Sequence, residues 1–247
     1  MHKPLFLALM LLQTAAVPSP TPSAAFDVAS IKPNNTGSGH VGIHSDNGLY
    51  NASNVRVRHL LEGAFHIKSE LISGIPGPLD SQHFDISAKI VADHPGKLSE
   101  AEMRATLLHL LEERFALKAH IETRILPVYE LVVAPTGSKL KASPTADGGT
   151  SVSVHNDRDL IAHDDPMSDL ASELSDQVHR TVLDKTGLSG HFDFELHWTS
   201  EEDSGNGADP RPGLFTALQE QLGLKLQSSK GPVEVLIVDH IETPTAN

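Results

Sequence analysis

The stretch "HFDFELHW", residues 191–198, alternates apolar and polar side chains with the two-residue period of a half-buried β-strand. One face carries Phe192, Phe194, Leu196 and Trp198, and the other carries His191, Asp193, Glu195 and His197. The same three-residue opening occurs earlier in the chain, in "HFDISAKI" at 83–90. We therefore expect these two strands to occupy equivalent places in a repeated unit.

Three further segments recur in the same order. "IHSDNGLYNASNVRVRHLL" from Ile43 resembles "VHNDRDLIAHDDPMSDLA" from Val154, "LLHLLEERFALKAH" (107–120) resembles "LFTALQEQLGLKLQ" (214–227), and "PVYELVVA" from Pro127 resembles "PVEVLIVD" from Pro232. These ordered matches predict a tandem duplication, with a first unit at 26–140 and a second at 151–247. The residues between them, 141–150, are rich in Gly, Ser, Thr and Pro and indicate a linker.

Each copy is predicted to contain two helices. The longer helix of the first copy spans 100–115, with a capping box formed by Ser99 and Glu102, and its twin spans 214–222 and stops at Gly223. The earlier helices are predicted to begin near Asn54 and near Asp165, where the Asp acts as N-cap and Pro166 takes the first helical position. This order of elements favours an α+β fold: two tandem related units, each a mostly antiparallel sheet with two helices packed on one face.

The N-terminal segment indicates export. Residues 1–25 join a basic residue, an apolar run and small residues to a Pro-rich stretch, the layout of a signal peptide and leader. The mature chain is then periplasmic or extracellular, without insertion into the membrane, and the absence of Cys excludes disulfides. A net charge of −13 argues against nucleic acid as partner, although 15 histidines would offset that charge at mildly acid pH.

Several long motifs carry a resemblance to a known family. They are "FDVASIKPN" at 26–34, "LLEERFALKAHIETRILPVYELVVA" at 110–134, "LDKTGLSGHFDFELHW" at 183–198 and "LFTALQEQLGLKLQSSKGPVEVLIVDHIE" at 214–242. Together they resemble an uncharacterised family of exported, soil-associated proteins of acidobacteria, classed as a domain of unknown function. The resemblance implies export and, in some relatives, fusion to a membrane metallopeptidase of the antibiotic-sensor type. It implies no catalytic residues.

Three short motifs match the signatures of penicillin-interacting serine enzymes. Ser138 to Lys141 fits S-x-x-K, Ser45-Asp46-Asn47 fits S-D-N, and Lys185-Thr186-Gly187 fits K-T-G. Their order along the chain differs from that of the enzymes, and Ser138 lies in a Pro- and Gly-rich stretch that does not favour a helix. We therefore expect the three motifs not to converge, and we interpret Lys185-Thr186-Gly187 as a turn.

The histidines and carboxylates suggest weaker sites. His191 with Asp193 could share a site on one strand face, and two other pairs could converge across hairpins, namely His40 with His44 and His155 with His163. No H-E-x-x-H motif is present in the sequence, so we assign no metal ligands. Because Asp85 and Asp193 recur in both copies, we expect them to be structural, either paired with Lys118 or Lys225 or holding the preceding turn.

No residue set in the sequence is assigned as catalytic, cofactor-binding or metal-binding. The function that the sequence favours is a non-catalytic binding or interaction module of the cell envelope, whose sheet edge or inter-unit groove holds a peptide, a glycan or an envelope protein. Two alternatives stay open. One is a hydrolase or β-lactam-responsive sensor, and the other is a metal-binding exported protein.

Overall fold

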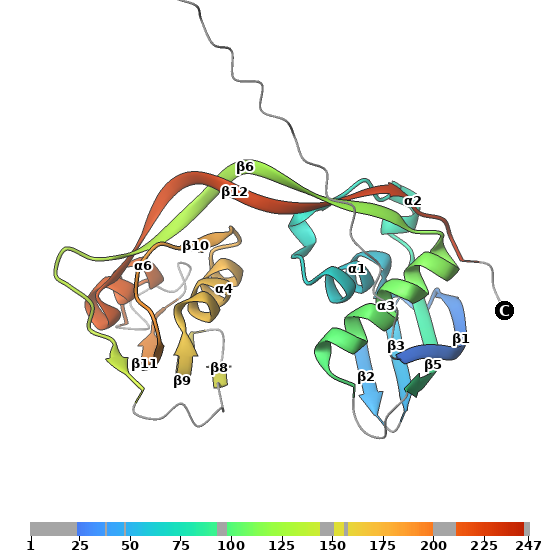
Figure 1. The fold of residues 1–247 in the computed structure, drawn as a ribbon, viewed down its shortest axis with the longest axis horizontal. Helices are drawn as coiled ribbons and strands as arrows, with labels where there is room; N and C mark the ends of the chain where they lie inside the picture. The colour runs from blue at the N-terminus through green and yellow to red at the C-terminus, as the bar shows by residue number, and fades with distance from the viewer. Residues whose placement is uncertain are drawn as a thin grey trace, which may run out of the picture. The chain divides into compact units, whose positions relative to one another are not determined.

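Two compact units make up the chain in the computed structural model, which describes residues 24–37, 39–46, 48–92, 98–143, 151–155, 158–199 and 211–244 (Figure 1). Unit 1 comprises Met1–Thr123 with Glu234–Asn247, and unit 2 comprises Arg124–Val233. The predicted leader (1–25) and linker (141–150) lie mostly outside the described residues. Helices and mostly antiparallel strands together confirm the α+β class. Within the described residues, no helix is both long enough and apolar enough to span a membrane.

Unit 1 is built on an antiparallel sheet in the order β1-β5-β3-β2. Its strands are β1 (Ala24–Asn34), β2 (Gly42–Asp46), β3 (Leu49–Arg56) and β5 (His83–Ala92). Helices α1 (Val57–Phe65) and α3 (Glu100–Phe115) cover one face of the sheet, α1 packing against β3 and α3 against β1 (Figure 1). The connection from α1 to β5 contains a short 3-10 turn η1 (Ser69–Leu71), β4 (Ile72–Ser73) and α2 (Gly77–Asp80).

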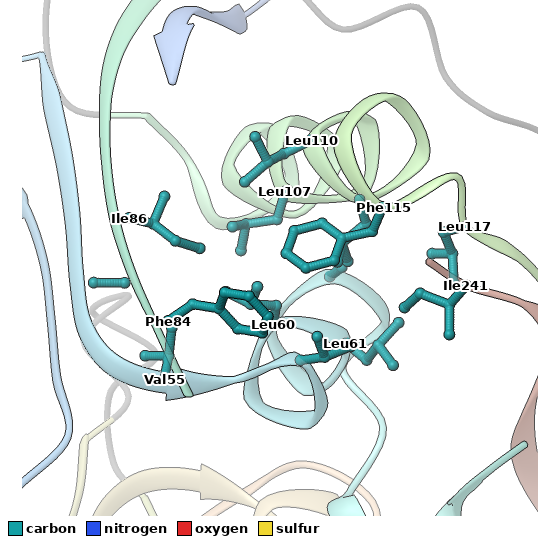
Figure 2. Packing of buried hydrophobic residues seen from close by; sticks show 14 of the residues in the cluster. Val55, Leu60, Leu61, Phe84, Ile86, Leu107, Leu110, Phe115, Leu117 and Ile241 are labelled. Atoms are coloured by element: carbon teal, nitrogen blue, oxygen red, sulfur yellow. The ribbon is translucent and has the colours of Figure 1, made fainter. Parts of the chain in front are cut away.

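Helix α3 begins where the sequence predicts. The Ser99 hydroxyl accepts the Glu102 N–H at 3.3 Å, and the Ser99 N–H donates to Glu102 Oε2 at 2.9 Å, which completes the expected capping box. The apolar stripe of α3 enters the core of unit 1, where the rings of Phe84 and Phe115 meet edge to face at 5.6 Å between centroids (Figure 2). Val55, Leu60 and Leu61 pack around them, as Figure 2 shows.

Unit 2 has a second sheet with the corresponding order, β7-β11-β9-β8. Its strands are β7 (Lys141–Ala142), β8 (Ser151–His155), β9 (Asp159–Pro166) and β11 (His191–His197), and its helices are α4 (Met167–Gln177) and α6 (Leu214–Ala217), the latter continued by the π-helical turn η2 (Leu218–Leu222). The alternation of "HFDFELHW" is confirmed, because its apolar face is buried throughout. The predicted helix at 214–222 is confirmed in its limits and in its stop at Gly223, at φ 65°, but its second half is π-helical.

Two long strands continue from one unit into the other. In unit 1, the start of β6 (Lys118–Val133) pairs with the end of β12 (Leu224–His240), and β12 in turn pairs in parallel with β4. In unit 2, the remainder of β6 pairs with the start of β12 and, in parallel, with β10 (Val182–Asp184). These four strands form one sheet in the order β10-β6-β12-β4. Unit 2 is a continuous stretch of the chain, whereas unit 1 includes the C-terminal segment Glu234–Asn247.

The two earlier helices begin later than predicted. Asn54 and Asp165 both lie in strands, so Asp165 is not an N-cap: α1 begins at Val57, and α4 at Met167 after Pro166. The reason is a β-bulge, in which Asn54 takes a left-handed φ of 57° and its N–H donates to Asp85 Oδ1 at 2.9 Å. This hydrogen bond holds the extended chain beyond Asn54, so the strand continues to Arg56 before the helix turns.

An equivalent bulge occurs in unit 2. Asp164 has φ 54°, and its N–H donates to Asp193 Oδ1 at 2.9 Å. Asp85 and Asp193 therefore hold equivalent bulges rather than the predicted lysine pairs or the preceding turn. In the described structure they accept hydrogen bonds from backbone amides and, for Asp85, from Asn34 Nδ2. The two units share strand order and bulge, while the duplication itself stays a prediction.

Candidate functional site

A cavity of about 370 Å³ lies in unit 1, where the end of α1, the start of α3 and the edge strand β2 come together. It is within the size range of small-ligand sites. The residues that line it are Ser45, Gly63, His66, Leu98, Ser99, Glu100, Met103, Arg104 and Leu107.

The inner end of the cavity is set by the close approach of α1 and α3. Gly63 faces Leu107, and a Cβ on Gly63 would lie 3.3 Å from Leu107 Cδ1, tighter than an ordinary contact. Helix α1 then stops at His66, whose left-handed φ of 54° turns the chain away and whose N–H donates to Glu62 O at 2.8 Å. The space beyond Gly63 is therefore left open between the two helices.

The lining combines an apolar wall with a few polar groups. Leu98, Met103 and Leu107 supply the apolar surface, and the remaining side chains present hydroxyl, imidazole, carboxylate and guanidinium groups. The Ser99 hydroxyl is committed to the helix cap, because it also donates to Glu102 Oε2 at 2.7 Å. Such a site suits an apolar group that carries hydrogen-bonding atoms beside it.

The helices that form the cavity fall almost entirely within a region that matches a sequence family. Residues 58–241 match a family described as "Protein of unknown function (DUF3738)". The chain belongs to this family. No curated protein and no solved structure matches it. The family match confirms the expected domain of unknown function; the acidobacterial source and the metallopeptidase fusions implied by the resemblance stay expectations.

The DUF3738 region includes α3 and all of α1 except Val57, whereas Ser45 on β2 precedes it. Sequence reasoning considered Ser45 only as part of the S-D-N motif and missed the other lining residues. The capping box located the start of α3, but the opposite wall comes from a glycine and a helix end about 40 residues earlier, which no local pattern brings together.

The S-x-x-K motif of the DUF3738 chain does not start a helix. Ser138 lies in the loop after β6, where its hydroxyl accepts the Leu140 N–H at 3.2 Å, and Lys141 lies on β7. Both belong to unit 2, whereas Ser45 belongs to unit 1 and Asn47 lies outside the described residues. The helical context that the serine enzymes require is therefore missing here.

The K-T-G motif is a turn, as predicted. It follows β10, and the Thr186 N–H and hydroxyl both donate to Asp184 Oδ1, at 2.9 and 2.8 Å. The Leu188 N–H donates to the Thr186 hydroxyl at 3.1 Å, and Gly187 adopts φ 68°. These bonds direct the chain into the loop that leads to β11.

The polar face of β11 makes two separate clusters rather than one. His191 Nδ1 lies 3.2 Å from Asp164 Oδ1, and Asp193 holds the backbone of the same Asp164. At the other end of the strand, His197 Nδ1 lies 2.8 Å from Asp159 Oδ1. His191 and Asp193 thus share a partner, which sequence reasoning had not included.

The His197 cluster is a network of charges. Glu195 Oε2 lies 3.3 Å from His197 Nε2, and Arg211 Nη1 donates to Asp159 Oδ1 at 2.9 Å. The hydrogen bond with Asp159 raises the pKa of His197, and the same bond holds the pKa of Asp159 below its usual value. In the part of the chain that the structure describes, no three His, Asp or Glu side chains are arranged to hold a metal ion.

The backbone places the remaining histidine pairs as follows. In the β8–β9 hairpin, His163 pairs with Ser151 and His155 pairs with Asp159, so the two histidines lie at opposite ends of the ladder. In unit 1, the His40 carbonyl accepts a hydrogen bond from Asn54 Nδ2 at 3.0 Å. The backbone at His40 is thereby fixed to the bulge of β3.

Proposed function

We propose that the protein is an exported binding module of the cell envelope and that unit 1 holds its ligand in the cavity between α1, α3 and β2. The cavity carries this proposal, because its size and its apolar wall with a few polar groups match those of ligand sites. We consider three kinds of partner: a peptide, a glycan or an envelope protein. Each would place one chemical group in the cavity. The acidic charge of the chain favours such partners over nucleic acid.

The lining supports binding more than catalysis. An activated serine would need a base within hydrogen-bond distance, but the Ser99 hydroxyl bonds with Glu102, the residue of its own helix cap. Within the described residues, no hydrogen bond joins His66 to a serine of the cavity. The second candidate, a β-lactam-responsive serine, has even less support, because Ser138 lies on no helix.

Export rests on the N-terminal sequence at 1–25. Expression of the full chain in a bacterial host, followed by fractionation and intact mass measurement, tests it. A periplasmic product shortened near Ala16 or Ala25 is expected. A full-length product retained in the cytoplasm would contradict export and leave the cavity untouched.

Methionine signals offer a direct test of binding. The chain has four Met residues, of which Met103 lines the cavity and Met167 is buried in unit 2. In protein labelled with ¹³C at the methionine methyl groups and assigned by Met→Leu variants, a library of small apolar fragments should shift the Met103 signal while that of Met167 stays in place.

A matched pair of variants completes this test. Ser45→Phe places a ring in the cavity and should abolish the shift of the Met103 signal. Ser53→Phe places the same ring on an exposed position of the neighbouring strand β3 and should leave the shift unchanged. Fragments that never move the Met103 signal, or that move it equally in both variants, would refute the cavity as the ligand site.

A further inference from the structure

The two edges of the unit 1 sheet differ in how they are protected. At one edge, β1 carries a bulge between Phe26 and Val28 and has Lys32 and Pro33 just before its last residue, Asn34. Bulges, Lys and Pro are the usual devices that keep an edge strand from pairing with another chain. Strand β1 is therefore built to remain an edge.

The opposite edge, β2, has no bulge, Lys or Pro, although it is short and ends in Asp46. Its sequence is "GIHSD", without Lys or Pro, and its pairing with β3 runs from Gly42 opposite Ser53 to Asp46 opposite Leu49 without a shift of register. In the sheet order, β2 has β3 as its one neighbour among the described strands. Every second residue of such a strand directs its N–H and C=O away from the sheet.

The side chains of β2 add an apolar surface beside the cavity. Ile43 lies opposite the buried Ala52, and Ser45 lies opposite the buried Tyr50, so both point to the face that the helices cover. Yet Ile43 is 50 % exposed, and Val41 just before the strand is 40 % exposed. The described helices thus leave this face only partly covered at Ile43 and Val41.

The cavity and the open edge are continuous through Ser45, which belongs to β2 and also lines the cavity. A strand added beside β2 would lie about 4.8 Å farther out and would direct every second side chain to the same face as Ser45. Those side chains would lie over Ile43 and enter the cavity next to Met103.

We propose that the ligand of unit 1 is an extended peptide that adds to the sheet as a strand beside β2 and places an apolar side chain in the cavity. This inference rests on the proposed function and specifies its ligand class. Backbone hydrogen bonds to β2 supply affinity without regard to sequence, and the cavity supplies selection for an apolar residue at one position. The chain's net charge of −13 disfavours acidic peptides.

Fluorescence anisotropy with labelled peptides tests this inference on the full chain. The probe is a decapeptide that alternates Thr with Leu, and three controls share its length. The first control is made in two forms, each methylated on every second backbone nitrogen but in the opposite register. The second control has Asp in place of Leu. The third has the same composition as the probe, with Leu at helical spacing. The alternating peptide should bind at least tenfold more tightly than the Asp peptide, the helical peptide and one of the two N-methylated forms.

Two variants of the protein locate the site. Ile43→Lys gives β2 the charge that protects β1 and should weaken the alternating peptide at least tenfold, as should Ser45→Phe. Ser53→Phe should bind like the parent chain. Since the N-methylated peptides are compared on the parent chain, the test does not depend on whether a variant folds.

The outcomes separate this inference from the proposed function. Equal affinity for the unmethylated alternating peptide and both of its N-methylated forms would overturn strand addition. No peptide binding in a protein whose Met103 signal still responds to fragments would also overturn it and would leave the cavity as a small-molecule site. If neither peptides nor fragments are bound, both proposals fail.

Discussion

Asp165 links stability to pH, because its carboxyl group lies in a core position. It is 1 % exposed, and in the described structure neither carboxyl oxygen has a hydrogen-bond partner. It pairs with Phe192 just before α4, as the fully buried Val55 pairs with Phe84 just before α1 (Figure 2). Unit 2 thus places an acid where unit 1 places an aliphatic side chain.

Burial raises the pKa of Asp165 from 3.8 to about 6. The carboxylates of Asp169, Glu173 and Asp164 add to this shift, and His191 opposes it. The folded state holds the Asp165 proton more tightly than the unfolded state does. Protonated Asp165 therefore contributes to the unfolding free energy below about pH 4, and this contribution is lost as pH rises through about 6. A shift of roughly two pKa units corresponds to about 3 kcal/mol of unfolding free energy lost by pH 7.

Asp165→Asn removes the charge and keeps the shape. We expect its unfolding free energy to match that of the parent chain below pH 4 and to exceed it by about 3 kcal/mol at pH 7, which for a unit of this size is a rise of roughly 10 °C in Tm. Circular dichroism melts between pH 3.5 and 7.5 measure the difference, with Glu234→Gln, an exposed carboxyl, as control. A difference between Asp165→Asn and parent that does not change with pH would refute this account.

Three other substitutions test separate contacts. Gly74→Ala should prevent folding of unit 1, measured by loss of cooperative unfolding, because Gly74 has φ 92° and a Cβ would collide with a backbone carbonyl of β12. Arg58→Met should cost about 2–3 kcal/mol in urea unfolding, since its guanidinium bonds to both oxygens of Asp80 and to two backbone carbonyls. His197→Gln should lower Tm at pH 5.5, because the hydrogen bond with Asp159 raises the pKa of His197 and protonated His197 stabilises the fold. The difference in Tm should shrink as pH rises and His197 loses its proton. A Tm difference that stays unchanged up to pH 8.5 would contradict this.

Local sequence patterns predicted the elements whose stabilising contacts are local. The Ser99 capping box and the alternation of "HFDFELHW" each depend on residues a few positions apart, and both are confirmed. The starts of α1 and α4 were predicted too early, near Asn54 and at Asp165, the latter because an Asp before Pro166 is typical of an N-cap. The strand continues past these positions because the N–H of Asn54 or Asp164 in the bulge donates to the carboxylate of Asp85 or Asp193, some 30 residues later.

The candidate site was less accessible to sequence reasoning for a related reason. The cavity depends on the close approach of α1 and α3 at Gly63 and on an edge strand, and neither produces a periodic pattern in the sequence. The composition of the polar face of β11 indicated a possible site at its histidines. Their partners Asp164 and Asp159 lie on β9, however, and come close to them only because β9 pairs with β11.

The position of unit 2 between the two parts of unit 1 along the chain constrains when the protein can fold. In unit 1, Ile72 of β4 pairs with Leu236 of β12, a contact that joins the first third of the chain to its last residues. A nascent chain therefore cannot complete unit 1 and then add unit 2, as ordinary tandem domains do. Such distant pairings also slow folding, so the chain stays unfolded or partly folded until its C-terminal strand is available.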